Sequence, residues 1–441
     1  QELVANLAKI RALTVISGPS NRDYGEASMS VQQIARQLQA NAVVEGTLLR
    51  WGNKVRITAE LVEASTGRYL WADSYEAELG NILQLENKVA RAIADHTQIE
   101  ITPEEEQRLA DAPTVDPRAY DDYLKGLYYW NERSVRGLTR ATRYFRQAIS
   151  IDPQYALSYA GLADCYAILG STVVDAMPPR EAAPKAKEAA LKAIEINDKL
   201  AEAQTALATM QFNYAWDWPA AEQGFKRAIE LNPSYATAHQ RYSLFLIAMG
   251  RDQASLAEIR RARALDPLSI SINFSLGWRL YLARHFDQAI EQLRTTVEMD
   301  PRFALANMVL GEAYEQKGQE RKAIAELEKA VSNSKDSPLM ESELGRAYAV
   351  AGEREKAEKV LAKLQEESKR EYVSPFRLAI VYGGLGEKDL AIGELEKAYT
   401  DRANGLIFIK VDPELDSLRS DPRFQRILGQ LRLPGLSQAN H

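Results

Sequence analysis

Along most of the chain, hydrophobic and small residues recur with the spacing of amphipathic helices that pack in pairs. The dipeptides Asn232-Pro233, Asp266-Pro267 and Asp300-Pro301 follow one another at intervals of 34 residues. Two glycine-rich series share this interval: Ser243, Gly277, Gly311 and Gly345, and then Gly250, Gly318, Gly352 and Gly386, interrupted only at Arg284. A period of this length predicts a solenoid of helix-turn-helix units, in which each unit contacts only its neighbours.

One unit shows how such a helix pair would pack. Small residues at Gly311 and Ala323 let two helices approach, and Leu310, Tyr314 and Leu327 fill the space between them. With this spacing the chain resembles the tetratricopeptide repeat family. The resemblance implies a right-handed superhelix that binds a partner and has no catalytic role. The pattern predicts eight repeats over residues 119–403, entered through a linker at 101–118.

In the first hundred residues the hydrophobic period changes several times, as a mixed α and β domain requires. Residues 54–63 alternate, with Val55, Ile57, Ala59 and Leu61 on one face. Gly52-Asn53 joins them to residues 42–51 as a two-residue hairpin. The other predicted elements are an opening helix at 3–10, a buried strand at 12–17, a loop at 18–28, a helix at 31–38, a strand at 68–74 and a helix at 82–93.

This first unit resembles the TolB-like domain that precedes tetratricopeptide arrays in many bacterial signalling and regulatory proteins. The resemblance rests on a series of short segments: Ile34-Ala35-Arg36-Gln37-Leu38, Val44-Glu45-Gly46, Val55-Arg56-Ile57-Thr58, Thr66-Gly67, Leu70-Trp71-Ala72 and Leu83-Gln84-Leu85-Glu86. The family pattern begins with a strand and a glycine-containing helix entry, which are absent before Leu3. We therefore expect a domain truncated at its start, whose unpaired sheet edge could join a second copy of the chain.

These elements predict an α+β chain with five parts: a small α/β TolB-like domain at 1–100, the linker at 101–118, the all-α superhelix at 119–403, a capping helical segment at 404–436 and a tail at 437–441. The capping segment carries an apolar stripe of Phe424, Ile427, Leu428 and Leu431. Solenoid ends need such a cap, because the last repeat otherwise exposes its core face.

Composition narrows the classes of partner. The 55 basic and 61 acidic residues give a net charge of −6, without the basic excess of a nucleic-acid-binding region. No run of about 18 apolar residues is present, so we expect no membrane span in this chain. The single Cys165 cannot form an intrachain disulfide, and cysteine usage leaves the compartment open between the cytoplasm and the extracytoplasmic part of a membrane-anchored protein.

We find no catalytic, metal-binding or cofactor-binding constellation in the sequence. His96, His239, His285 and His441 are scattered and lack partners at the spacing of a metal site or a nucleophilic triad. Cys165 is interpreted as a buried, inert thiol. Aromatic residues gather at Tyr214, Trp216 and Trp218, where packing of a lengthened turn is favoured over a recognition site.

The resemblance to tetratricopeptide repeats implies that partners bind on the concave face, at positions two, five, nine and twelve of the first helix of each repeat. The residues predicted for this groove are Leu244, Ile247, Phe274, Trp278, Tyr281, Met308, Glu312, Glu315, Phe376 and Ile380. Their apolar and aromatic character suits an extended or helical peptide. The alternative is that packing between repeats, or the chain's own terminal segment, covers these side chains.

The sequence therefore favours a non-catalytic protein-protein interaction scaffold, which binds a protein or peptide as the partner-binding or sensory part of a larger bacterial signalling or transcriptional regulatory protein. A free-standing assembly or chaperone-like factor for envelope proteins is the alternative. A hydrolase in the amino-terminal domain is a third hypothesis, for which no nucleophile and base can be identified.

Overall fold

The computed structural model describes residues 31–38, 40–97, 115–171, 176–334 and 337–434, together with the isolated positions 7, 10, 13, 15, 16, 102 and 174. The opening helix, buried strand and loop predicted before residue 30 fall, apart from the isolated positions, outside the described residues. The same holds for most of the predicted linker and for the tail at 437–441.

The first unit is a three-stranded antiparallel sheet with the strand order β1-β2-β3. Its strands are β1 (Ala42–Trp51), β2 (Lys54–Glu63) and β3 (Tyr69–Glu78). Trp51 pairs with Lys54 across the predicted two-residue turn, where Gly52 has a φ of +58°. Val55, Ile57, Ala59 and Leu61 are buried, which confirms the alternation predicted for the central strand.

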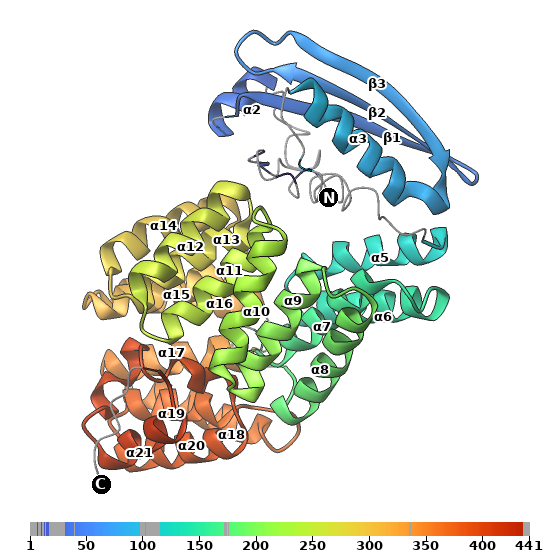
Figure 1. Ribbon diagram of the computed structural model, residues 1–441. Coiled ribbons are helices and arrows are strands. Elements are labelled where there is room, and N and C mark those ends of the chain that lie inside the picture. The colour runs from blue at the N-terminus through green and yellow to red at the C-terminus, as the bar shows by residue number, and fades with distance from the viewer. Residues whose placement is uncertain are drawn as a thin grey trace.

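Helix α3 (Ile82–His96) covers the face of the sheet that is turned toward the helical array (Figure 1). It follows a short turn, η1 (Leu79–Asn81), and α2 (Val31–Leu38) lies at one end of the same sheet (Figure 1). Contacts with the first helix of the array join the two parts. Arg50 forms an ion pair with Asp121 at 2.6 Å, and the hydroxyl of Tyr120 donates to Glu86 at 3.3 Å.

In the described residues beyond 115, helices form eight consecutive antiparallel pairs that wind into a solenoid (Figure 1). The pairs are α5 (Pro117–Trp130) with α6 (Val135–Ile151), α7 (Ala156–Leu169) with α8 (Pro179–Ile196), α9 (Ala201–Met210) with α10 (Trp218–Leu231), α11 (Ala236–Ala248) with α12 (Asp252–Leu265), α13 (Ile270–Leu282) with α14 (Phe286–Met299), α15 (Ala304–Gln316) with α16 (Glu320–Ser334), α17 (Pro338–Val350) with α18 (Arg354–Glu367), and α19 (Pro375–Gly384) with α20 (Lys388–Thr400). The predicted fold class is confirmed.

Close helix packing explains the glycine at the same place in successive repeats. A methyl group added at Gly277 would lie 2.6 Å from Cγ of Leu293, and one at Gly311 would lie 2.7 Å from Cγ of Leu327. The second glycine series marks turns between the two helices of a repeat. Gly318 there has a φ of +65°, and Arg284 adopts nearly the same left-handed conformation with a φ of +63°.

After α20 the chain turns back along the inside of the solenoid. We call residues 404–434 the C-terminal segment; it contains η3 (Asn404–Phe408), η4 (Pro413–Leu418) and α21 (Pro422–Gln430). Its apolar side chains, among them Phe408, Leu415 and Phe424, belong to the same hydrophobic core as repeats three to eight. The segment therefore reaches well beyond the last repeat.

Hydrogen bonds fix the C-terminal segment to the middle of the array. The indole nitrogen of Trp218 donates to the carbonyl oxygen of Leu431 at 3.0 Å, and Lys410 donates to that of Met249 at 3.2 Å. The π-helical turn η2 (Gln211–Ala215) ends α9 and lies beneath the segment, with Tyr214 buried. The aromatic cluster at 214–218 thus packs a lengthened turn, as the sequence favoured.

Candidate functional site: the concave face

Most of the residues predicted for the groove lie beneath the C-terminal segment or between repeats. Leu244, Trp278 and Glu315 are partly buried. The buried ones are Ile247, Phe274, Tyr281, Met308, Glu312, Phe376 and Ile380. The structure brings Phe274, Trp278, Tyr281, Met308, Glu312 and Phe376 together around one pocket, which residues of the C-terminal segment also line.

The contact between the C-terminal segment and the groove is tight. The ring of Phe408 lies 5.1 Å from that of Trp278, measured between centroids. A methyl group at Gly405 would come within 2.6 Å of Cδ1 of Phe376, so this glycine lets the segment approach the aromatic floor. No external peptide could occupy this half of the groove while the segment is in place.

Two arginines beneath the segment are paired with carboxylates. Arg346 forms ion pairs with Glu315 at 2.8 Å and with Glu414 of the segment at 3.1 Å. Arg377 pairs with Glu343 at 3.3 Å. Burial and the neighbouring Glu312 raise the pKa of Glu343 to about 8, and burial raises the pKa of Glu414 well above its usual value. We call this group the paired cluster.

The other half of the concave face stays open as a cavity enclosing about 710 Å³ of empty space, part of which is continuous with solvent. Of the predicted groove residues, Leu244, Phe274 and Trp278 line it. The remaining apolar wall comes from Ile168, Val174, Phe303 and Leu305, and the uncharged polar wall from Ser171, Asn213, Gln240, Ser271, Ser275 and Asn404.

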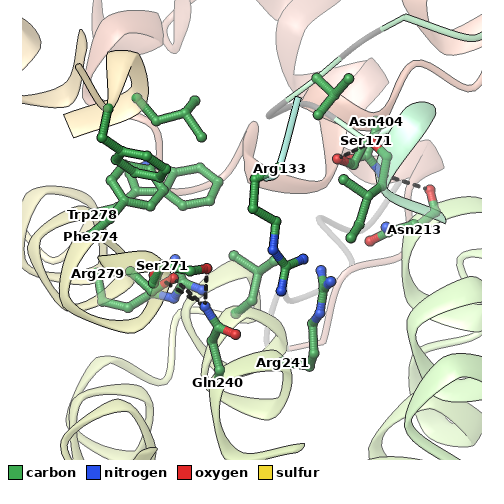
Figure 2. Close-up of a pocket in the computed structure, with 16 residues that line it drawn as sticks. Arg133, Ser171, Asn213, Gln240, Arg241, Ser271, Phe274, Trp278, Arg279 and Asn404 are labelled. Atoms are coloured by element: carbon green, nitrogen blue, oxygen red, sulfur yellow. Dashed lines mark hydrogen bonds between the residues drawn. The ribbon is translucent and has the colours of Figure 1, made fainter. Parts of the chain in front are cut away.

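Three arginines that sequence reasoning missed also line this cavity: Arg133, Arg241 and Arg279. Figure 2 shows the guanidinium groups of Arg133 and Arg241 pointing toward one another across it. Arg241 and Arg279 stand at positions six and ten of their helices. These are not among the positions two, five, nine and twelve that were expected to face the groove. Arg133 stands in the lengthened turn between α5 and α6. The extra length of that turn was the only feature of the sequence that could have indicated a functional residue there.

No described carboxylate forms an ion pair with any of these three arginines. Nη1 of Arg279 and Nε of Arg241 are buried without a hydrogen-bond partner in the described residues. Nε of Arg279 donates to Oγ of Ser243 at a long 3.4 Å. Arg133 stacks on Trp130, with its guanidinium carbon 3.5 Å from the ring centroid. We call Arg133, Arg241 and Arg279 the unpaired cluster.

Electrostatics agree with this geometry. Burial and the charge of Arg241 lower the pKa of Arg133 and that of Arg279 to about 9, so both remain protonated at neutral pH. Asp164 on α7 is the carboxylic acid that acts on Arg133 and Arg241, and burial raises the pKa of its carboxyl. One of its oxygens, Oδ1, has no hydrogen-bond partner in the described residues. The cavity therefore carries an excess of positive charge.

The histidines and the cysteine show no catalytic arrangement where the structure describes them. Nδ1 of His239 lies 2.6 Å from Glu258, and its Nε2 lies 3.0 Å from the carbonyl oxygen of Pro233, so both ring nitrogens are engaged. Cys165 is buried, and burial raises the pKa of its thiol. No group of three or more His, Cys, Asp or Glu side chains suited to a metal ion occurs among the described residues.

Comparison with known protein families identifies the kind of repeat in the helical array. A model of the tetratricopeptide repeat matches residues 274–338. The helical array is built of tetratricopeptide repeats. Among solved structures, a thermophilic tetratricopeptide repeat protein from Thermus thermophilus is 17% identical, covers 45% of this chain and 99% of its own, and gives a TM-score of 0.38. The sheet that precedes the repeats is present, while its likeness to a TolB-like domain stays a prediction.

Two curated relatives share parts of this repeat protein. A protein of Rhizobium meliloti (strain 1021), named as a candidate adenylate cyclase, is 28% identical over 163 residues, or 37% of this chain and 28% of the relative. The transcriptional regulator HilA of Salmonella typhimurium is 23% identical over 266 residues, or 59% of this chain and 46% of the regulator. The chain thus spans less than half the length of either relative.

No helix in the described part of the repeat protein is long and apolar enough to cross a membrane.

Proposed function

We propose that this repeat protein is a non-catalytic scaffold for protein-protein interaction and forms the partner-binding or sensory part of a larger bacterial signalling or transcriptional regulatory protein. Tetratricopeptide repeats generally serve as such scaffolds, which supports the first part of the proposal. Support for the second part comes from the likeness to HilA and to the candidate cyclase, both of which are longer proteins.

The open cavity is the observation that carries this proposal. Leu244 and Trp278 are predicted groove residues that remain partly exposed, and both line the cavity beside the C-terminal segment. An apolar side chain of a partner would bury against them, at about 1.5 to 3 kcal/mol per large side chain before ordering costs. Phe274 lines the same cavity. The predicted groove residues beneath the C-terminal segment would serve a partner only after that segment has moved away.

Site-specific photocrosslinking tests where a partner binds. With p-benzoylphenylalanine in place of Leu244, irradiation of cells that express the chain at its native level should give a discrete crosslinked product. The same residue in place of Leu191, which is 46% exposed on α8, is the matched control and should not give that product. Trp278→Ala should abolish the product at position 244. Identical products from both positions, or a product that survives Trp278→Ala, would overturn the cavity as the partner site.

The absence of catalysis is part of the same proposal. It is supported by the engaged nitrogens of His239 and by the buried thiol of Cys165, which has no activating base among the described residues. Incubating the purified full chain with ATP and Mg²⁺ should form no cyclic AMP above a protein-free control. Formation of cyclic AMP that tracks the chain through purification would contradict a purely binding role.

We also propose that a second copy of the chain joins through the amino-terminal sheet. β1 and β3 are the outer strands of the described sheet, and Leu48, Leu49 and Tyr69 on them are 58%, 59% and 60% exposed. Such edges favour strand addition. Analytical ultracentrifugation should show a dimer that Leu49→Lys dissociates. A monomer at all concentrations, or a dimer unaffected by this substitution, would exclude the sheet edge as an interface.

A further inference from the structure

The unpaired cluster is assembled from three distant parts of the chain. Arg133 comes from the turn between α5 and α6, Arg241 from α11 and Arg279 from α13. They meet because the solenoid curves, which brings the first repeat opposite the fourth and fifth across the cavity (Figure 2). Neither the repeat pattern nor helix packing requires a cation at any of these positions.

Buried or partly buried cations without counterions are costly, and proteins normally pair them or leave them in water. Here Arg241 acts on both Arg133 and Arg279, and Asp164 is the carboxylic acid that acts on Arg133 and Arg241 among the described residues. Among the described residues, three positive charges thus face a single carboxyl. A negatively charged ligand would supply the counter-charges that this part of the described fold lacks.

The rest of the cavity wall indicates which chemical groups such a ligand would carry besides its negative charge. Phe274 and Trp278 are stacked, with ring centroids 6.0 Å apart, and form an aromatic surface at one side of the arginines (Figure 2). Beside this apolar side, the amide of Gln240 is held by Ser271 and Ser275 at 2.9 to 3.2 Å. Small-molecule sites combine apolar walls with a few convergent polar groups, and this wall has both.

We infer that this cavity binds a small organic anion, whose carboxylate or phosphate oxygens contact Arg133 and Arg241 while its aromatic or apolar part lies against Phe274 and Trp278. Planar guanidinium groups suit both kinds of anion, because each can donate two parallel hydrogen bonds to a pair of oxygens. The ligand would join the first repeat to the fourth. This inference goes beyond the proposed scaffold, since it requires no protein partner.

Isothermal titration of the full chain with defined probes tests the inference. The probes are phenyl phosphate, phenylacetate, inorganic phosphate and, as an uncharged control, benzyl alcohol. We expect saturable binding of at least one aromatic anion, at least tenfold tighter than inorganic phosphate and benzyl alcohol. Preference for phenyl phosphate over phenylacetate, or the reverse, would assign the anionic group.

Variants distinguish this cavity from general attraction to a charged surface. Arg241→Gln should weaken binding of the preferred probe at least tenfold. Arg261→Gln should leave it unchanged, because Arg261 is exposed on α12 of the same repeat. Equal binding by the Arg241→Gln variant and the unsubstituted chain, or no saturable binding of either aromatic anion, would overturn the inference. Inorganic phosphate binding as tightly as phenyl phosphate would also overturn it, since the aromatic wall would then have no part.

The unsubstituted chain provides a second test that does not depend on any variant folding. A ligand that binds only the native state raises the thermal midpoint in proportion to the logarithm of its concentration. The preferred probe should therefore raise the midpoint above that measured in sodium chloride of equal ionic strength. An equal midpoint in both solutions would contradict a specific site.

Discussion

Two groups of arginines on the same concave face differ in whether the chain provides them with carboxylate partners. In the paired cluster, Arg346 and Arg377 lie against Glu315, Glu343 and Glu414, and one of those acids belongs to the segment that closes the groove. In the unpaired cluster, the arginines line a cavity and form no ion pair with a described carboxylate. Where the chain covers its own groove it supplies carboxyl partners for the arginines, so the cavity without such described partners is the place to expect an external anion.

The largest effect should come from removing an arginine of the paired cluster. Arg346→Met leaves Glu315 and Glu414 buried without their partner, a change that typically costs about 3 to 5 kcal/mol. Urea unfolding followed by circular dichroism should show this loss.

Arg261→Met serves as the matched control for this substitution. It changes an exposed arginine that lacks a described ion pair, and it should leave stability within about 0.5 kcal/mol. A loss below about 1 kcal/mol for Arg346→Met would show that the paired cluster does not hold the C-terminal segment in place.

The same substitution in the unpaired cluster should act with the opposite sign. Arg279 is buried, and its guanidinium carbon lies 5.0 Å from the ring centroid of Trp278, but one of its terminal nitrogens lacks a partner in the described structure. Arg279→Met therefore removes a cation that has no described carboxylate partner. We expect the ligand-free chain to gain about 1 to 3 kcal/mol in the same urea experiment. A loss of stability as large as that of Arg346→Met would erase the distinction between the two clusters.

Stability should fall as pH rises through the neutral range, because of the carboxyls in the paired cluster. Burial first, and then the negative charge of Glu312, raise the pKa of Glu343 to about 8, whereas an unfolded glutamate titrates near 4.5. The folded state therefore holds a proton that the unfolded state has lost. The stability from that proton is complete below pH 4.5 and is lost as pH rises toward 8.

The groups that face Glu343 from the elements packed against it are Glu312 on α15, Arg377 on α19, Arg346 on α17, and Asp412 and Glu414 of the C-terminal segment. We expect a loss of about 1 kcal/mol per pH unit between about pH 6 and 8, measured as urea midpoints. Glu343→Gln should flatten this dependence. Stability that increases with pH over the same interval would refute the assignment.

The smallest effect should come from an ion pair at the rim of the closed half. Arg284 forms a bidentate pair with Asp416 at 2.7 Å, yet it is 46% exposed and its φ of +63° is one that glycine adopts more readily. In Arg284→Gly, relief of backbone strain and loss of the pair should nearly cancel, with a net change within about 0.5 kcal/mol. A loss above about 2 kcal/mol in thermal unfolding would mean that rim pairs, not buried ones, close the groove.

Local patterns allowed much of the fold to be predicted. Strands at 42–51 and 54–63 follow from alternation and from the Gly52-Asn53 turn, both of which lie within a few residues of the structure they specify. The helix pairs follow from the 34-residue period, because each repeat contacts its neighbours. These signals are repeated or local, so they can be interpreted from the sequence without knowing which distant segments are in contact.

Distant contacts explain what the sequence left open. Lys410 reaches Met249 and Asn404 reaches Asn213 across most of the array, and no periodicity indicates which segment will lie in the groove. The sequence allowed us to name covering of the groove by the terminal segment as an alternative to partner binding, but it could not decide between the two. The arginines of the cavity come from three separate repeats and from positions that face the interior only because the solenoid curves.

Hydrogen-deuterium exchange of the full chain, read by mass spectrometry with and without phenyl phosphate, tests the contrast between the two halves most directly. The account predicts that η3 and η4 exchange as slowly as α13 in the free chain. It also predicts that phenyl phosphate slows exchange in residues 131–136, α11 and α13 while leaving α17 to α20 unchanged. Fast exchange of η3 and η4 in the free chain, or no protection of α11 and α13 by the anion, would contradict it.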